Sequence, residues 1–234
     1  MSGHSKWSTI KRQKEANDKA RGKTFSKLSR GISLAAKQGG SNPETNYKLK
    51  IAIETAKSEN MPKANIDRVL TKAAENPDLT EITYEGFGPS GVQIMVEVAT
   101  DNKNRSAQEI KKVFEKGGGR FAGPGAVSFN FDSMGYLLIK KLRDTEGQML
   151  EIIDHGVRDV VEGEEGIEVY VDPEKLTTTR NMLEQKYEIL SFDLTKKPKT
   201  VAKVEEERTR ERTMSLLQSL DDMEDVQKVF TNIE

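Results

Sequence analysis

Residues 157–171 read VRDVVEGEEGIEVYV, in which two apolar runs flank a turn rich in glycine and glutamate. Runs of β-branched and aromatic residues around such a turn predict a β-hairpin, with strands at 157–161 and 167–171. Apolar residues at helical spacing lie on both sides of this hairpin, over 146–154 and over 174–186. These segments therefore predict the centre of a mixed unit of helices and strands.

Two further predicted strands, at 136–140 and 188–195, lie outside those helices. The resulting order is strand, helix, strand, strand, helix, strand, which is the order of the ferredoxin-like split βαβ unit. We therefore predict a ferredoxin-like domain over residues 133–200.

The segments on either side of this unit are predicted to form one discontinuous domain. The segment before it predicts strands and a helix, and the segment after it supplies one more of each. The predicted elements are strands at 82–86, 92–98, 126–131 and 226–230 and helices at 106–116 and 205–220. Together they give four strands and two helices, and we propose that they form one domain into which residues 133–200 are inserted.

The N-terminal segment predicts helices alone, at 20–37, at 46–58 and from Pro62 onward, and Asn76-Pro77-Asp78 ends it. The predicted fold class is α+β with three domains. These are a helical N-terminal domain (1–77), a discontinuous α/β middle domain (78–132 plus 201–234) and an inserted ferredoxin-like βαββαβ domain (133–200).

Charge is distributed unequally along the chain. Residues 1–75 contain 16 Lys and Arg against seven Asp and Glu, a net charge of +9, whereas the remaining residues have a net charge of −10. An asymmetry of this size indicates an anionic partner for the basic segment, either nucleic acid or an anionic membrane surface. No stretch approaches the roughly 20 apolar residues of a membrane span, and we expect nucleic acid rather than a membrane as the partner.

The candidate nucleic-acid-binding residues are the cations of the first 40 residues and two ring side chains near the start of the chain. They are His4, Lys6, Trp7, Lys11, Arg12, Lys14, Lys19, Arg21, Lys23, Lys27, Arg30 and Lys37. Lysine and arginine supply most of the sequence-independent affinity for nucleic acid through phosphate contacts. The alternative is a solvated helix face, although only Glu15 and Asp18 offset ten cations in this stretch.

Two features of the basic segment carry further expectations. Within the helix at 20–37, Lys23, Lys27, Arg30 and Lys37 lie opposite the apolar face, and Leu34 lies among them. We expect their replacement by alanine to leave the fold intact and to reduce affinity. Trp7 either stacks on a base or packs on the helical domain.

No combination of residues indicates an enzyme. The chain has no cysteine, which excludes disulfides and thiolate chemistry and is compatible with a reducing compartment. The glycine-rich stretch 117–123 follows a predicted helix and precedes a strand, whereas a dinucleotide site needs strand, loop and helix in that order. His4 and His155 have no ligand-like spacing to carboxylates. We expect no catalytic activity, cofactor or metal. Residues 101–105 (DNKNR) predict either a helix cap made by Asn104 or a polar contact loop.

Several motifs, in this order along the whole chain, resemble those of the YebC family, also called YebC/PmpR. They are GHSKW at 3–7, RGK at 21–23, NMP at 60–62, YEGFGP at 84–89, DNKNR at 101–105 and GAVSF at 125–129. Small departures are Ser90 and Ser106, where the family often has Gly and Thr, and Gly31, where a better helix former is usual.

The resemblance implies three domains and a cytoplasmic protein catalogued as a DNA-binding transcriptional regulator. It also implies a relationship to a mitochondrial translational activator of cytochrome c oxidase subunit I, and bacterial members have been linked to ribosomes stalled on proline runs. Two hypotheses follow. The first is DNA binding in transcription, with the helix at 20–37 along the duplex. The second is ribosomal RNA binding in translation, which a basic tail with a stacking ring favours.

Overall fold

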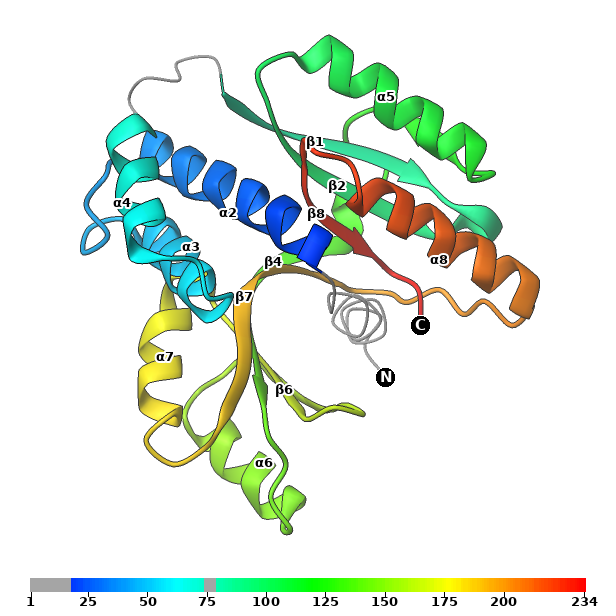
Figure 1. Ribbon diagram of the computed structural model, residues 1–234. Coiled ribbons are helices and arrows are strands. Elements are labelled where there is room, and N and C mark those ends of the chain that lie inside the picture. Colours follow the sequence, from blue (N-terminus) through cyan, green and yellow to red (C-terminus); the bar gives the residue numbers. More distant parts are fainter. Residues whose placement is uncertain (1–17, 74–78) are drawn as a thin grey trace.

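The computed structural model describes residues 18–73 and 79–234, and for residues 18–21 and 23 it describes the backbone without the side chains. It contains helices and two antiparallel sheets, which confirms the predicted α+β class. Figure 1 shows the N-terminal helices on one side, the first sheet opposite them and the second sheet below.

Three helices form the N-terminal unit: α2 (Asp18–Gly39), α3 (Tyr47–Ser58) and α4 (Lys63–Lys72). Their apolar faces meet in one core, which includes Ile32 from α2, Leu49 from α3 and Ile66 from α4. Asn46 caps α3 by accepting a hydrogen bond from the Leu49 amide. The three predicted helices are therefore present, and their apolar faces pack together in this core.

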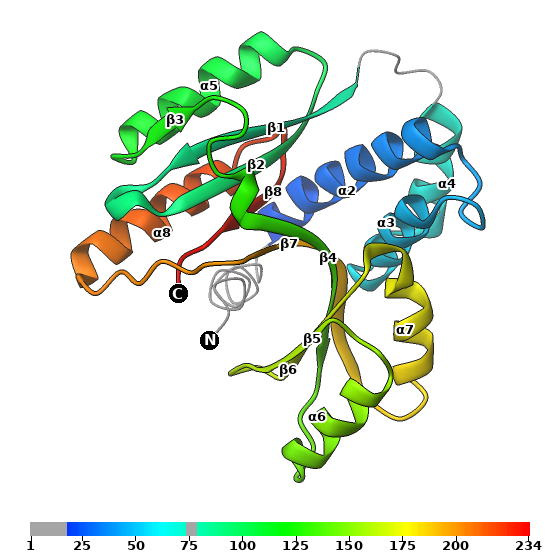
Figure 2. The ribbon, with the colours of Figure 1, turned by 180° about the vertical axis from the view of Figure 1, so that it is seen from behind.

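The first sheet has the strand order β3-β1-β2-β8. Its strands are β1 (Thr80–Phe87), β2 (Gln93–Thr100), β3 (Arg120–Ala122) and β8 (Val226–Thr231). Helices α5 (Lys103–Lys116) and α8 (Glu207–Asp221) cover one face, as seen in Figure 2. Phe114 of α5 and Leu217 of α8 are fully buried against Val96 of β2 in this core. The last strand of the chain thus completes a sheet that begins near residue 80.

The second sheet has the order β5-β6-β4-β7, which is the predicted ferredoxin-like order. Its strands are β4 (Phe131–Ile139), β5 (Asp159–Glu162), β6 (Ile167–Val171) and β7 (Ile189–Pro198). Its helices are α6 (Thr145–Asp154) and α7 (Leu176–Leu183), and the short 3₁₀ helix η4 (Pro173–Lys175) precedes α7. Ile152 and Leu176 pack against Leu137 and Val169 in the core under these helices.

Strands β4 and β7 connect the two sheets as a long ribbon, paired from Phe131↔Pro198 to Ile139↔Ile189. The division of the chain at 77/78, 132/133 and 200/201 into three domains stays our proposal. It is supported by one main apolar core in each unit, although Ile51 of α3 packs into the core of the second sheet.

The predicted strand at 126–131 is wrong. Residues 128–130 form the 3₁₀ helix η3 (Ser128–Asn130), and the third strand of the first sheet is β3, which pairs with β1. The reason is Glu85, whose carboxylate accepts hydrogen bonds from the amides of Gly125, Val127 and Ser128. Amides that donate to a side chain are not available to a strand ladder.

Leu34 explains the imperfect charge pattern of α2. Its side chain is buried against Leu79 and Ala99 of the first-sheet unit. Ala99 lies on the sheet face opposite Val98, and Val98 belongs to the core under α5 and α8. Helix α2 therefore packs on the uncovered face of the first sheet with the side that carries its lysines and arginines.

Candidate nucleic-acid interface

The predicted binding residues divide into three groups by position. His4, Lys6, Trp7, Lys11, Arg12 and Lys14 lie outside the described residues. Lys19, Arg21 and Lys23 belong to the first turns of α2. Lys27, Arg30 and Lys37 follow along the same helix and have described side chains.

The last three cations all contact the first-sheet unit. Arg30 donates to the Asp225 carboxylate over 2.7 Å and to the Glu224 carboxylate over 2.9 Å. The Nζ of Lys27 donates to the carbonyl oxygen of Asp221, and its ion pair with the Asp221 carboxylate spans 3.5 Å. The Nζ of Lys37 donates to the carbonyl oxygen of Leu79 over 2.9 Å. Lys27 and Arg30 therefore hold α2 against the end of α8 and the acidic residues that follow it, and Lys37 holds α2 against the residue before β1.

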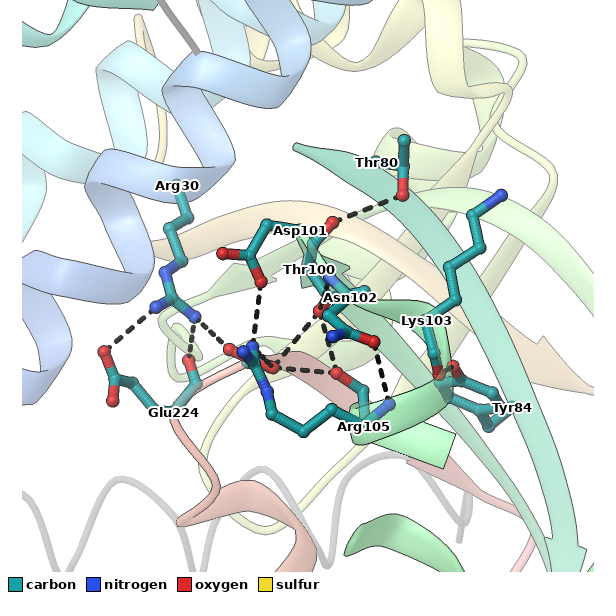
Figure 3. Close-up of polar contacts among 11 residues, drawn as sticks. Arg30, Thr80, Tyr84, Thr100, Asp101, Asn102, Lys103, Arg105 and Glu224 are labelled. Carbon is teal, nitrogen blue, oxygen red and sulfur yellow. Dashed lines mark hydrogen bonds and ion pairs between the residues drawn. The ribbon is translucent and has the colours of Figure 1, made fainter. Parts of the chain in front are cut away.

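Asp225 is the centre of this contact. Besides Arg30, its carboxylate accepts hydrogen bonds from Ser106 Oγ over 2.8 Å, Arg105 Nη2 over 3.1 Å and Thr100 Oγ1 over 3.3 Å. Burial opposes its ionisation, but hydrogen bonds from Ser106, Arg105 and Arg30 outweigh burial and lower the pKa of Asp225. Figure 3 shows Arg30 and Arg105 approaching this point from different elements.

The motif at 101–105 has a structural role in the same network. Asn102, and not the predicted Asn104, caps α5 by accepting a hydrogen bond from the Arg105 amide over 3.1 Å. Arg105 also pairs with Asp101 over 2.9 Å, and the Tyr84 hydroxyl donates to the carbonyl oxygen of Lys103 (Figure 3). The motif starts a helix and places Arg105 against Asp225.

The motifs at 84–89 and 125–129 meet at Glu85. Burial opposes ionisation of this side chain, but hydrogen bonds from the amides of Val127, Gly125 and Ser128 outweigh it and lower the pKa of Glu85. Sequence reasoning missed this contact because its partners are about 40 residues apart.

The glycine-rich stretch is a packed turn. A side chain at Gly119 would place its Cβ 2.6 Å from the carbonyl oxygen of Phe87, and one at Gly117 would lie 2.7 Å from Leu216. Gly118 has a positive φ of 77°. Tight packing and backbone conformation therefore account for these glycines.

Other exposed cations make no side-chain hydrogen bond or ion pair with any described residue, and sequence reasoning did not select them. On the N-terminal helices they are Lys57, Lys63, Arg68 and Lys72, and on α5 they are Lys103, Lys112 and Lys116. Arg120 lies over the Phe87 ring at 5.3 Å. The amphipathic pattern of α4 was the signal that could have identified Lys63, Arg68 and Lys72.

A cleft of about 1380 Å³ lies between α2, α3, β7 and β8. Eight acidic side chains line it against five cationic ones. Burial raises the pKa of Glu97 in its wall, although Lys228 and Lys196 oppose the shift. An acidic surface repels phosphate, so this cleft does not suit a nucleic-acid backbone.

Within residues 18–73 and 79–234, no cluster of three or more His, Cys, Asp or Glu is placed to hold a metal ion. The same residues include no helix with the length and apolarity that crossing a membrane requires.

Two family models match nearly the whole chain. The model for the TACO1/YebC protein N-terminal domain matches residues 5–76, and the model for the TACO1/YebC second and third domain matches residues 79–233. Both of the relatives described next carry names that describe a regulator of transcription.

A "Probable transcriptional regulatory protein" of Dictyoglomus thermophilum is 43% identical over 240 residues, covering 100% of this chain and 96% of the relative. The "Probable transcriptional regulatory protein YrbC" of Bacillus subtilis is 42% identical over 238 residues, covering 99% of each. The crystal structure of the conserved hypothetical protein Aq1575 from Aquifex aeolicus superposes with a TM-score of 0.84 at 40% identity, covering 93% of this chain and 91% of that one.

Proposed function

Because the chain belongs to the TACO1/YebC family, we propose that it is a non-enzymatic, nucleic-acid-binding regulator of gene expression. The observation that carries the proposal is the net charge of +9 on residues 1–75 against −10 on the rest of the chain. Nucleic acid attracts the basic segment, and the acidic remainder limits non-specific contact by the other units.

Within the basic segment, we assign phosphate contacts first to Lys6, Lys11, Arg12, Lys14, Lys19, Arg21 and Lys23, with His4 and Trp7 beside them. Lys27, Arg30 and Lys37 remain members of the proposed set. Phosphate contact by these three competes with their bonds to Asp221, Glu224, Asp225 and the Leu79 carbonyl. Their share in binding is therefore expected to be smaller.

Duplex DNA is the first proposed target, because the relatives are named regulators of transcription. The test is crosslinking of the protein in cells, followed by sequencing of the recovered DNA and RNA. Enrichment at discrete promoter sequences, with ribosomal RNA at background, is the expected result. Recovery of neither nucleic acid above background would contradict the proposal.

Ribosomal RNA is the second candidate target, and the sequence Gly3-His4-Ser5-Lys6-Trp7 favours it. A small, cationic segment with one large ring suits irregular RNA, where it can stack on an unpaired base. In that case the crosslinks concentrate at one ribosomal RNA site and are lost when Lys6 and Trp7 are replaced by alanine. Such a result would make the chain a translation factor, with a role such as relief of stalling at proline runs.

A further inference from the structure

Helix α4 presents a polar, cationic face to solvent. Ile66 is buried and Val69 and Leu70 are partly buried in the helical core, whereas the opposite side is exposed. The exposed residues are Lys63, Ala64, Asp67, Arg68, Thr71 and Lys72. This face therefore offers three cations and one carboxylate, together with short side chains that allow close approach of a partner.

The cations of this face differ from Lys27, Arg30 and Lys37 of α2 in having no partner among the described residues. Lys63, Arg68 and Lys72 make no hydrogen bond or ion pair through their side chains with any described residue. Lys27 and Arg30, by contrast, are bonded to Asp221 and Asp225. A phosphate or a base that meets α4 therefore displaces no bond between these side chains and residues 18–73 or 79–234.

The connection between α3 and α4 is a short turn of fixed conformation. It comprises the four residues 59–62. Asn60 has a φ of 60°, a left-handed conformation that asparagine tolerates, and its amide donates to the carbonyl oxygen of Lys57 over 3.0 Å. Met61 is buried, and its amide donates to the carbonyl oxygen of Ala56 over 2.9 Å. A connection of this length also joins the two helices of a helix-turn-helix unit, whose second helix enters the major groove.

Helix α4 lies at the outer edge of the described part of the molecule. Figures 1 and 2 both show it at the outer edge, supported by α2 and α3 and distant from the second sheet. Its inner face contacts α2 and α3. The long helix α2 thus supports α4 from behind, as the first helix does in a three-helix DNA-binding unit.

We propose that α3 and α4 form a helix-turn-helix unit in which α4 is inserted into the major groove of duplex DNA. Arg68 is the residue expected to read guanine, since its guanidinium donates two hydrogen bonds to the O6 and N7 atoms of that base. Lys63 and Lys72 contact phosphates on either side of the groove. This inference rests on the proposed function and specifies which surface performs it.

The test compares two triple variants that each remove three free cations from one helix. Lys63→Ala/Arg68→Ala/Lys72→Ala changes α4, and Lys103→Ala/Lys112→Ala/Lys116→Ala on α5 is the matched control. The probe is a labelled duplex of about 30 base pairs, three helical turns, enriched from a random library on the full-length wild-type protein. Thermal unfolding of each variant shows that the fold is retained.

We expect the α4 variant to bind the probe at least ~30-fold more weakly, and the α5 variant to change affinity less than ~3-fold. The slope of log affinity against log salt is expected to fall by about two to three units for the α4 variant alone. Arg68→Lys keeps the charge but loses the two-pronged contact, so it should keep the salt slope and lose the preference for the enriched sequence over a scrambled one.

Equal affinity of the α4 variant and the wild type would overturn this inference while the proposed function stands. So would an equal loss in both triple variants, because that pattern means diffuse attraction. A wild-type protein that enriches structured RNA and no duplex would also overturn it. If the wild type enriches no nucleic acid of either kind, the proposed function itself fails.

Discussion

At the residue scale, Asp225 is the group on which most charges converge. It receives Arg30 from the N-terminal helices and Arg105 from α5, and its side chain is only 12% exposed. A carboxylate that joins two cations from separate elements fixes the angle at which those elements meet. Its contribution therefore exceeds that of an exposed surface pair.

Replacing Asp225 with asparagine is expected to destabilise the protein by ~2 kcal/mol. The change replaces the charged acceptor that Arg30 and Arg105 share by a neutral amide, and hydrogen bonds to charged groups are worth about 1.5–3 kcal/mol. Urea unfolding measures the loss. Lys111→Ala is the control, because its pair with Glu115 spans 3.9 Å and is exposed, so a change below ~0.5 kcal/mol is expected. Equal losses in the two variants would show that Asp225 adds nothing beyond a surface charge.

The lowered pKa of Glu85 predicts that the stability of the protein depends on pH. Its pKa is lowered from an ordinary value of 4.5, so the unfolded chain takes up a proton at a higher pH than the folded protein does. The stabilisation is complete well above pH 4.5 and is lost as the pH falls through the lowered folded pKa. Asp225 acts in the same direction.

Glu85→Gln is therefore expected to lower the free energy of unfolding at pH 7 by ~2 kcal/mol, since one amide oxygen replaces a carboxylate that binds three amides. The difference from the wild type should shrink as the pH is lowered toward 3. Urea midpoints measured across this range test it. A constant difference at every pH would mean that the loss is steric.

At the scale of elements, α2 has two packing faces. One face joins the helical core through Ile32, and the other meets the first sheet through Leu34. Gly31 lies where α2 faces β8, and the nearest neighbour of a Cβ added there is the side chain of Gln227.

Gly31→Ala is expected to stabilise the protein by ~0.5–1 kcal/mol, the difference between alanine and glycine within a helix. The added Cβ would lie 3.6 Å from Gln227 Oε1, an ordinary contact with the end of a flexible side chain. Thermal unfolding measures the shift. Gly119→Ala is the contrasting change and should destabilise, because its Cβ would lie 2.6 Å from the Phe87 carbonyl oxygen. A lower melting temperature for Gly31→Ala would contradict this expectation, because it would mean that the contact with Gln227 costs more than the gain in helix propensity.

At the scale of the whole molecule, the basic segment and the acidic units are in contact through Arg30 and Lys27. The sequence-based expectation that Lys23, Lys27, Arg30 and Lys37 can be removed without affecting the fold has to be revised for this reason. Three of the four hold α2 to the first sheet, so the quadruple variant should unfold at a lower temperature as well as bind less tightly.

Affinity for nucleic acid is expected to fall steeply with salt, because each phosphate contact releases counterions. With five to seven contacts, raising the salt from 50 to 200 mM should weaken binding by roughly 10³-fold. Titration of a labelled duplex at several salt concentrations measures the slope. The acidic units of the chain do not bind phosphate and so do not contribute to this salt dependence. A flat response to salt would indicate a protein partner in place of nucleic acid.

The sequence by itself determined the elements and the separation of charge, because both depend on local order. Helical and strand periodicities depend on neighbours a few positions apart, and the ferredoxin-like order follows from the sequence of elements. The exception was 126–131, where the distant carboxylate of Glu85 takes the amides that a strand would use.

Only the tertiary structure decided which cations are free. Arg30 and Asp225 are 195 positions apart, and nothing in the local pattern of either segment indicates that they meet. Lys63, Arg68 and Lys72 bond to no residue that the structure describes, because they lie on the exposed side of a helix that packs through its opposite side. Charge can be counted along a chain, but whether a charge is neutralised depends on distance in space.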